Sequence, residues 1–235
     1  MDILTPFSRS RSLNNIPILK IKEFLKEIES SQDDPKIKML KTMAVNRYAE
    51  SNIPVEYWKL KMEKHFVGEQ ILKDIYDNYT KDLRSSYVNG TSFCLSGNHG
   101  VGKSMTCTCI LKKAAESNFN VLYTTLSDAV TTLLSAPDDD RFIARRELTT
   151  CDFLVIDEFD PRFFPSDNAS ALYARTLETI FRSRIQNKLP TIMCTNSPNV
   201  LESFSGSMKQ SLDSLFKGYL KIIPIIGKDF RKQPK

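Results

Sequence analysis

Near the amino terminus, apolar residues recur every three or four positions, which is the period of a helix with one buried face. The first such stretch covers residues 18–28. Its apolar positions are Ile18, Ile21, Phe24, Leu25 and Ile28, and Pro17 is expected in its first turn. A second helix is expected over about 36–51, with Asp34 as its cap. Residues 1–15 show no period and are expected to form a flexible arm. These segments predict a small helical region over residues 1–52.

From residue 68 onward the pattern predicts one further helix, over 68–84, and then a different kind of element. Short apolar runs alternate with longer amphipathic stretches, and the runs cover 92–96, 120–124, 153–156, 191–194 and 220–226. Strands separated by helices predict βαβ units and a mostly parallel sheet. The expected fold is therefore α/β, with a five-stranded, mostly parallel sheet flanked by helices over residues 53–231 and a basic tail over 232–235.

The first of these runs leads into a glycine-rich loop. Residues 97–104 read GNHGVGKS, which fits the pattern G-x-x-x-x-G-K-[ST] between a strand and a helix. Glycines let the backbone aim successive N–H groups at phosphate oxygens, and the following helix N-terminus adds a favourable dipole. The pattern predicts a phosphate-binding loop made of Gly97, Asn98, His99, Gly100, Val101, Gly102, Lys103 and Ser104.

Two side chains at the end of this loop are expected to bind ATP and its metal ion. Lys103 is expected to reach the β and γ phosphates, and the Ser104 hydroxyl to ligate Mg²⁺. His99 is expected to face solvent and to take no part in catalysis.

A pair of acids follows a later apolar run. Residues 153–158 read FLVIDE, a predicted strand that ends in two carboxylates. Asp157 is expected to hold Mg²⁺, directly or through water, and Glu158 to orient and deprotonate the attacking water. The interval between Lys103 and Asp157 leaves room for another strand, so the strands carrying the two motifs need not be neighbours.

A third polar residue, Asn196, ends the run TIMCTN and precedes Ser-Pro. Taken alone, this asparagine is equally consistent with a simple turn.

In their order and spacing, the segments 93–104, 155–158 and 195–197 resemble AAA+ ATPases, in particular the DnaC-type replicative helicase loaders and the related IstB-type transposition ATPases. The pattern IPxxY at 53–57, the predicted helix at 177–189 and the ending KDFR at 228–231 support the resemblance. It covers about residues 53–231. It implies that Asn196 contacts the γ-phosphate or the attacking water as a sensor residue, and that the chain has no C-terminal lid domain.

The resemblance implies a function and its partners. The protein would be an ATP-dependent loader that uses ATP and Mg²⁺, binds a hexameric replicative DNA helicase through residues 1–52 and delivers it to single-stranded DNA. It would act as a homo-oligomer, an open spiral or ring on the helicase. Two alternatives stay open, namely an IstB-like ATPase that assembles on duplex DNA and an ATP-binding adaptor that hydrolyses poorly.

The sequence departs from the family in its arginines. Many AAA+ sites are completed by an arginine from a neighbouring subunit, expected here between Asn196 and the last strand, but residues 185–230 contain none. Lys209 or Lys217 could substitute without the planar fork of a guanidinium, and Arg182 and Arg184 are further candidates. Because such an arginine contributes about 10³–10⁵ to the rate, we expect slow basal turnover or completion of the site by a partner.

Contacts to DNA are expected from basic side chains. The candidates are Lys112 and Lys113, the loop at 124–128 and the stretch 141–146. Phe163 and Phe164 lie between prolines and are expected to pack under the sheet, with a platform for bases as the alternative. The acids at 138–140 are expected to cap a helix over 141–148.

Composition adds limits. The 235 residues are 41% hydrophobic and 26% charged, which is typical of a globular protein. The sequence has no apolar run long enough for a membrane helix and no secretory signal. We therefore expect a cytoplasmic location without a membrane partner. The net charge of +5 resides in residues 217–235, which suits phosphate contact or simply solubility. The five cysteines are expected to be buried free thiols rather than metal ligands.

Overall fold

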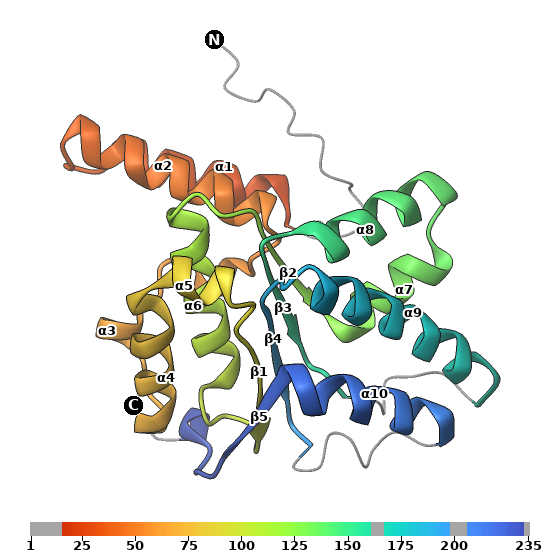
Figure 1. Ribbon diagram of the computed structural model, residues 1–235. Coiled ribbons are helices and arrows are strands. Elements are labelled where there is room, and N and C mark those ends of the chain that lie inside the picture. The colour runs from red at the N-terminus through yellow and green to blue at the C-terminus, as the bar shows by residue number, and fades with distance from the viewer. Residues whose placement is uncertain (1–15, 161–166, 198–205, 233–235) are drawn as a thin grey trace.

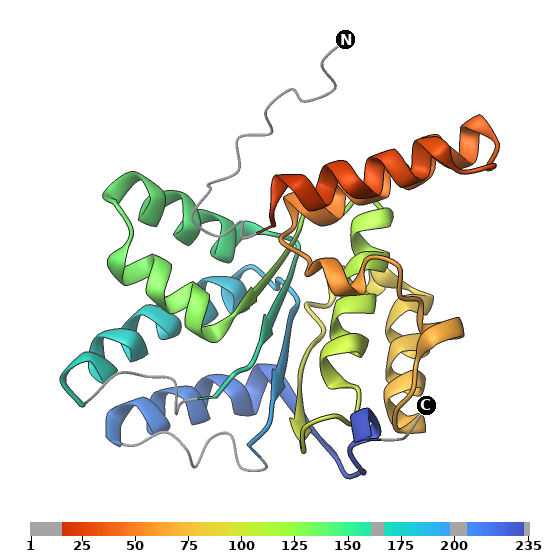
Figure 2. The same ribbon diagram turned by 180° about the vertical axis from the view of Figure 1, so that it is seen from behind.

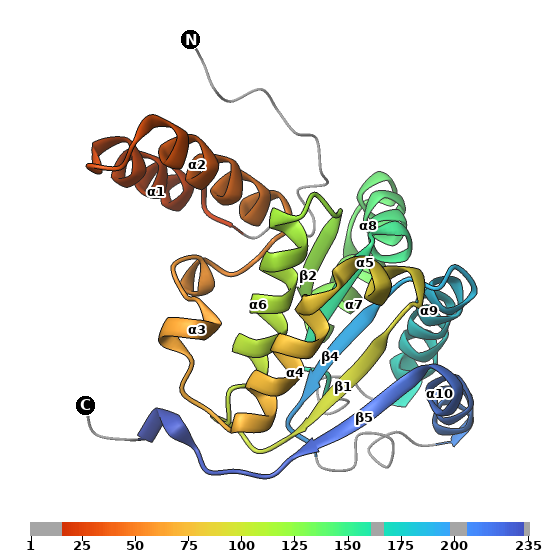
Figure 3. The ribbon, with the colours of Figure 1, turned by 60° about the vertical axis from the view of Figure 1, so that its left-hand side comes forward.

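The computed structural model describes residues 16–160, 167–197 and 206–232 (Figure 1). Two antiparallel helices, α1 (Ile18–Ser30) and α2 (Pro35–Glu50), form a hairpin that extends outward from the rest of the domain (Figure 3). Both predicted helices are confirmed. The Asp34 carboxylate caps α2 by accepting from Lys36 N at 2.8 Å and Ile37 N at 3.3 Å. Pro17 takes the capping position of α1, one residue before the expected first turn.

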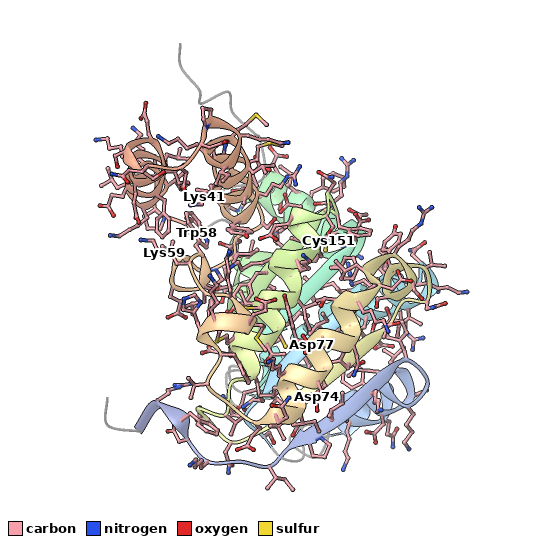
Figure 4. All side chains as sticks on the ribbon, turned by 90° about the vertical axis from the view of Figure 1, so that its left-hand side faces the viewer. Lys41, Trp58, Lys59, Asp74, Asp77 and Cys151 are labelled. Carbon is pink, nitrogen blue, oxygen red and sulfur yellow. The ribbon has the colours of Figure 1, made fainter. Side chains whose placement is uncertain are left out.

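The carboxyl-terminal end of α2 is built into the core of the domain. Val45, Tyr48 and Ala49 are buried there, and Arg47 donates to Ala115 O at 3.2 Å. Trp58 lies at the base of the hairpin (Figure 4), with its ring 4.9 Å from that of Phe24 in an edge contact. The hairpin is therefore anchored to the domain through the end of α2, while its far end projects outward.

The segment between the hairpin and the sheet contains a short 3-10 turn, η1 (Val55–Tyr57), and three helices, α3 (Met62–His65), α4 (Gln70–Lys81) and α5 (Leu83–Val88). The prediction of a single helix over 68–84 is therefore wrong. The helix is interrupted at Asp82, whose φ of −142° and ψ of 82° lie outside the helical region. The Asp82 carboxylate then accepts from Ser85 N at 2.8 Å and starts α5. A capping aspartate in the middle of an apolar pattern marks a new helix start.

The sheet contains five parallel strands in the order β2-β3-β4-β1-β5. Their bounds are β1 (Ser92–Gly97), β2 (Val121–Thr125), β3 (Phe153–Asp157), β4 (Thr191–Thr195) and β5 (Leu220–Ile225). Each lies within one residue of its predicted run. Strand β4 lies between β1 and β3, so the strands carrying the glycine-rich loop and the acid pair are not neighbours, as expected.

Helices cover both faces of the sheet and make two separate cores. Helices α4 and α6 (Lys103–Glu116) pack on one face with the end of α2. On the other face lie α7 (Leu126–Ser135), α8 (Asp138–Thr150), α9 (Asp167–Gln186) and α10 (Gly206–Tyr219) (Figure 2). The C-terminal segment ends in the 3-10 turn η3 (Phe230–Lys232). The carboxyl ends of all strands therefore open at one edge between two helical layers.

Two smaller expectations have different outcomes. The five cysteines are buried and free, as predicted. The acids at 138–140 do not cap a helix over 141–148, because α8 already begins at Asp138 and its cap, Pro137, makes no side-chain bond. They occupy the first turn instead, where carboxylates favour the positive end of the helix. In the part of the chain described, none of the helices has the length and apolar character needed to cross a membrane.

Candidate functional site

A cavity of about 400 Å³ opens at the carboxyl ends of the central strands. It brings together most of the site residues predicted from sequence, although they come from three separate stretches of chain. The predicted residues that line it are His99, Gly100, Gly102, Lys103, Ser104, Asp157, Glu158 and Asn196. Val101 is instead fully buried in the core, while Gly97 and Asn98 contribute backbone carbonyls.

Two glycines shape the loop between β1 and α6. Gly100 and Gly102 have φ values of 77° and 105°, in the left-handed region that favours glycine. A Cβ at Gly100 would overlap the Asp229 side chain, and one at Gly102 would lie 2.9 Å from the Phe66 ring. Gly102 caps α6, and its position provides no side chain to accept from the N–H groups of the first turn. These backbone N–H groups therefore lie at the end of the helix that meets the cavity.

Lys103 connects the loop to the end of β4 through hydrogen bonds. Its Nζ donates to Gly97 O at 2.8 Å, Asn98 O at 2.7 Å and Asn196 Oδ1 at 3.0 Å. Burial lowers the pKa of this ammonium from its ordinary value, while the nearby Asp157 carboxylate acts in the opposite direction. The predicted loop lysine and the predicted sensor asparagine therefore meet in one hydrogen-bonded group.

The acid pair occupies a tight turn after β3. Asp157 Oδ1 accepts from Glu158 N at 2.8 Å, and Asp157 Oδ2 accepts from the Tyr123 hydroxyl at 2.9 Å. Glu158 has a φ of 50°, which costs a residue with a side chain about 1–2 kcal/mol. The turn is held by Asp160 N, which donates to Glu158 O at 2.7 Å, and Phe159 N, which donates to Cys194 O at 2.8 Å. The Asp157 carboxylate is thus buried and fixed, while Glu158 is exposed toward the cavity.

The C-terminal segment adds an arginine to the cavity that the sequence did not assign to it. Phe230 N donates to Gly100 O at 3.1 Å, and Arg231 N donates to Asp229 Oδ1 at 2.9 Å. The Phe230 bond holds this segment against the loop, the Asp229 bond fixes the turn within the segment, and Arg231 lines the cavity. The KDFR ending supported the family resemblance, but its place beside Gly100 depends on how the chain leaves β5.

The prediction that Arg184 could complete the ATPase site of a neighbouring subunit is wrong. Its side chain is fully buried, and its guanidinium donates to Thr191 Oγ1, Leu148 O, Cys151 O and Pro190 O at 2.7–3.0 Å. It joins α9 to the ends of α8 and β4. Arg182 is exposed and forms an ion pair with Glu178 within α9.

Two of the DNA-contact candidates are also corrected. Lys112 is buried, and its Nζ donates to Tyr57 O, Trp58 O and Leu60 O at 2.6–3.0 Å, so it fixes the segment after the hairpin. Residues 124–128 are a strand end and a helix start, with Thr125 Oγ1 accepting from Asp128 N at 3.0 Å. Lys113, Arg145 and Arg146 are exposed, whereas Phe163 and Phe164 lie outside the described residues.

The donor set of this cavity fits a nucleotide with its magnesium ion. A glycine loop with no room for side chains, an uncapped helix N-terminus and a buried ammonium provide N–H donors for phosphate. The Ser104 hydroxyl and the Asp157 carboxylate line the same cavity, and oxygen ligands of this kind suit Mg²⁺.

The fold and this site define a P-loop ATPase with a parallel sheet. The sequence matches the family described as ATPases associated with various cellular activities (AAA) over residues 93–210, and the chain belongs to that family. Among curated proteins, none matches the sequence.

Solved structures with a similar fold include the replication initiator DnaA, DnaI and the DnaC helicase loader. DnaA bound to AMPPCP and single-stranded DNA is 17% identical, with a TM-score of 0.58 over 75% of this chain and 51% of that one. DnaI is 14% identical, with a TM-score of 0.58 over 75% and 93%. The DnaC helicase loader is 17% identical, with a TM-score of 0.53 over 73% and 99%. At these identities the likeness establishes the fold alone, and this chain spans about half the length of the DnaA structure.

Proposed function

We propose that this protein is an ATP-dependent loader of a hexameric replicative helicase, which it binds through residues 1–52 and delivers to single-stranded DNA. The observation that carries the proposal is an exposed apolar stripe on a hairpin anchored to the ATPase core. The fold shared with DnaC and DnaI is consistent with this function. ATP binding and hydrolysis would act as the switch between holding and releasing the helicase.

The nucleotide site has a defined role for each residue. Lys103 would bind the β and γ phosphates together with the backbone N–H groups of the loop, and Ser104 and Asp157 would hold Mg²⁺. When bound, the ion neutralises phosphate charge. Glu158 orients the attacking water and accepts its proton, and Asn196, already bonded to Lys103, orients the reacting end of the triphosphate.

Arg231 brings a guanidinium to the nucleotide cavity from this chain itself rather than from a neighbouring subunit. It is held beside the loop by the bonds of its neighbours and faces the cavity. A fixed guanidinium favours the anionic phosphates. Because no arginine occurs over 185–230, we still expect slow basal turnover in the isolated protein.

The hairpin stripe is the expected docking surface. Ile37, Leu40 and Met43 follow each other at intervals of three on α2, so they lie along one side of the helix. Their exposed fractions are 46%, 54% and 43%, and on the neighbouring helix Leu19 is 72% exposed. Exposed large apolar side chains grouped on a projecting element are typical of a protein-interaction site.

Replacing Leu40 by glutamate should weaken the complex with the replicative helicase of the source organism at least about 10-fold, because a charge would be buried in an apolar interface. Light scattering after size exclusion, with and without ATP, measures the complex. Val88→Glu is the matched control, because Val88 is 61% exposed on α5, away from the hairpin. A point substitution is preferable to deleting residues 1–52, since the end of α2 is part of the core.

Two results of that experiment would contradict the proposal. Equal binding by Leu40→Glu and Val88→Glu would exclude the stripe as the docking surface. No complex under any nucleotide condition, with assemblies forming on duplex DNA, would favour an IstB-like function instead.

Single-stranded DNA is the second proposed partner. Arg145 and Arg146 are adjacent, exposed and on α8, and Lys113 is exposed near the end of α6. Exposed arginines and lysines are the side chains that contact phosphates. We propose these three as DNA contacts in a homo-oligomer, in place of the buried Lys112.

A further inference from the structure

The backbone of Tyr123 is attached to the end of the hairpin. Strand β2 is at the edge of the sheet, so among the described residues one side of it has no neighbouring strand. On that side Tyr123 N donates to Ser51 O at 2.9 Å, and Tyr123 O accepts from Asn52 Nδ2 at 3.1 Å. Ser51 and Asn52 directly follow α2 and are both buried. The end of α2 therefore holds both backbone polar groups of a single residue in β2.

The side chain of the same tyrosine is attached to the ATPase site. Its hydroxyl donates to Asp157 Oδ2 at 2.9 Å, across the neighbouring strand β3. Tyr123 is 7% exposed and Asp157 is 5% exposed. Burial, followed by the adjacent Asp157 carboxylate, raises the pKa of the Tyr123 phenol well above its ordinary value. Because an ordinary phenol has a pKa of about 10, the Tyr123 hydroxyl carries its proton at physiological pH and is the donor of this bond.

Asp157 can accept this bond and still bind a metal ion. A carboxylate has about four lone-pair positions, and two are used here, by the Tyr123 hydroxyl and by Glu158 N. Groups that hydrogen-bond to a metal-binding carboxylate fix its orientation, and their loss typically costs 10–100-fold in metal affinity or activity. The hydroxyl is placed to do this for the one acidic ligand of the proposed Mg²⁺ site.

We propose that Tyr123 is a positioning residue that links the end of α2 to the metal-binding carboxylate of the ATPase site. One residue carries both halves of the link, through its backbone to Ser51 and Asn52 and through its hydroxyl to Asp157. A movement of the hairpin end would shift the Asp157 carboxylate, and metal binding would bias the hairpin in return. The inference rests on the nucleotide-binding part of the proposed function and not on the identity of the partner.

The first test removes only the hydroxyl, with Tyr123→Phe in the full chain. Binding of a fluorescent ATP analogue is followed while Mg²⁺ is titrated, and the measured quantity is the Mg²⁺ concentration at half-maximal binding. We expect this concentration to rise about 10-fold. Binding in EDTA should be unchanged, because the phosphate-binding loop is not altered.

The matched control is Tyr79→Phe. Tyr79 is 6% exposed, and its hydroxyl donates to Thr91 O at 2.8 Å, at the opposite end of the sheet from the cavity. It loses an equivalent buried hydrogen bond without touching Asp157. The proposal is overturned if Tyr123→Phe has the Mg²⁺ midpoint of the wild type, or if Tyr79→Phe raises the midpoint as much as Tyr123→Phe does.

The second test addresses the backbone half of the link with Asn52→Gly. Asn52 has a φ of 55°, which glycine adopts freely, so the change removes the Nδ2 bond and keeps the turn. We expect the Mg²⁺ midpoint to rise about 3-fold, the effect of one hydrogen bond. Lys188→Gly is the control, because Lys188 also has a φ of 50° but precedes β4 at the far end of the sheet.

Combining the substitutions distinguishes a link from two independent effects. In the double variant Tyr123→Phe, Asn52→Gly, the shift should be smaller than the product of the single shifts, since both act on one connection. Multiplicative shifts, or a wild-type midpoint for Asn52→Gly, would overturn the link to α2. Failure of the wild type itself to bind the analogue with Mg²⁺ would contradict the proposed function, which separates the two failures.

Discussion

Replacing Glu158 by glutamine should lower the rate of ATP hydrolysis by about 10²–10⁴-fold, the usual contribution of a general base. The amide has the shape of the carboxylate but cannot accept the proton of the attacking water. Glu158 is exposed toward the cavity, whereas Asp157 is buried and bonded on both oxygens. Of these two acids, Glu158 is therefore the better placed to receive a proton from a water in the cavity. Binding of ATP should stay within a few-fold of the wild type, because Lys103 and the loop are unchanged.

Single-turnover hydrolysis and equilibrium ATP binding, measured on the same samples, separate these two effects. Glu29→Gln on α1 is the matched control, since this exposed glutamate lies away from the cavity. A Glu158→Gln variant with wild-type turnover would show that another group activates the water. A variant that no longer binds ATP would show that Glu158 has a structural role in the turn after β3.

Replacing Arg184 by methionine should lower the free energy of unfolding by about 3 kcal/mol or more. The change removes the guanidinium donor from the carbonyls of Leu148 and Cys151, and each unsatisfied buried group costs about 1–3 kcal/mol. Pro190 O loses the same donor but still accepts from Leu154 N at 3.2 Å. Loss of the buried charge offsets part of this cost. For a domain of this size, the midpoint of thermal unfolding should fall by roughly 6–12 °C.

Arg182→Met provides the comparison, because Arg182 is exposed two positions away on α9 and only pairs with Glu178. Its midpoint should change little, since exposed ion pairs contribute about 0–1 kcal/mol. Thermal unfolding of both variants, with ATP turnover measured below the transition, decides the roles. If Arg184→Met kept the wild-type midpoint and lost turnover, Arg184 would belong to the catalytic machinery after all.

Local patterns were sufficient to predict the sheet and the nucleotide loop. Each strand is a short apolar run, and the glycine-rich loop follows its strand without interruption, so a few neighbouring residues determine both. The acid pair was equally predictable because it directly ends β3. These features place Lys103 and Asp157 at the same edge once the strands are parallel.

Long-range contacts determined what the sequence did not predict. The sequence predicts Lys112 and Arg184 as accessible cations, because lysine and arginine are mostly exposed in proteins. Each is buried, and its charge is accommodated by backbone carbonyls from other segments of the chain. These carbonyls belong to residues 57–60 for Lys112 and to residues 148, 151 and 190 for Arg184. No periodicity of apolar residues encodes such a carbonyl set.

The same reason explains the missed members of the site. Arg231 reaches the cavity because Phe230 bonds to Gly100, and Tyr123 reaches Asp157 because β2 and β3 are paired with Tyr123 opposite Val155. Both contacts depend on strand order and register. The motifs alone therefore predict the proposed phosphate and metal ligands but not the groups that contact them.

We propose that ATP binding at this site controls delivery of the helicase to DNA. The direct measurement is helicase assembly on a closed single-stranded DNA circle, followed as unwinding of an annealed strand, with wild type and Lys103→Ala. We expect ATP-dependent assembly with the wild type and loss of assembly with Lys103→Ala, because that variant lacks the ammonium proposed to bind phosphate. Equal assembly by both proteins would contradict the ATP switch.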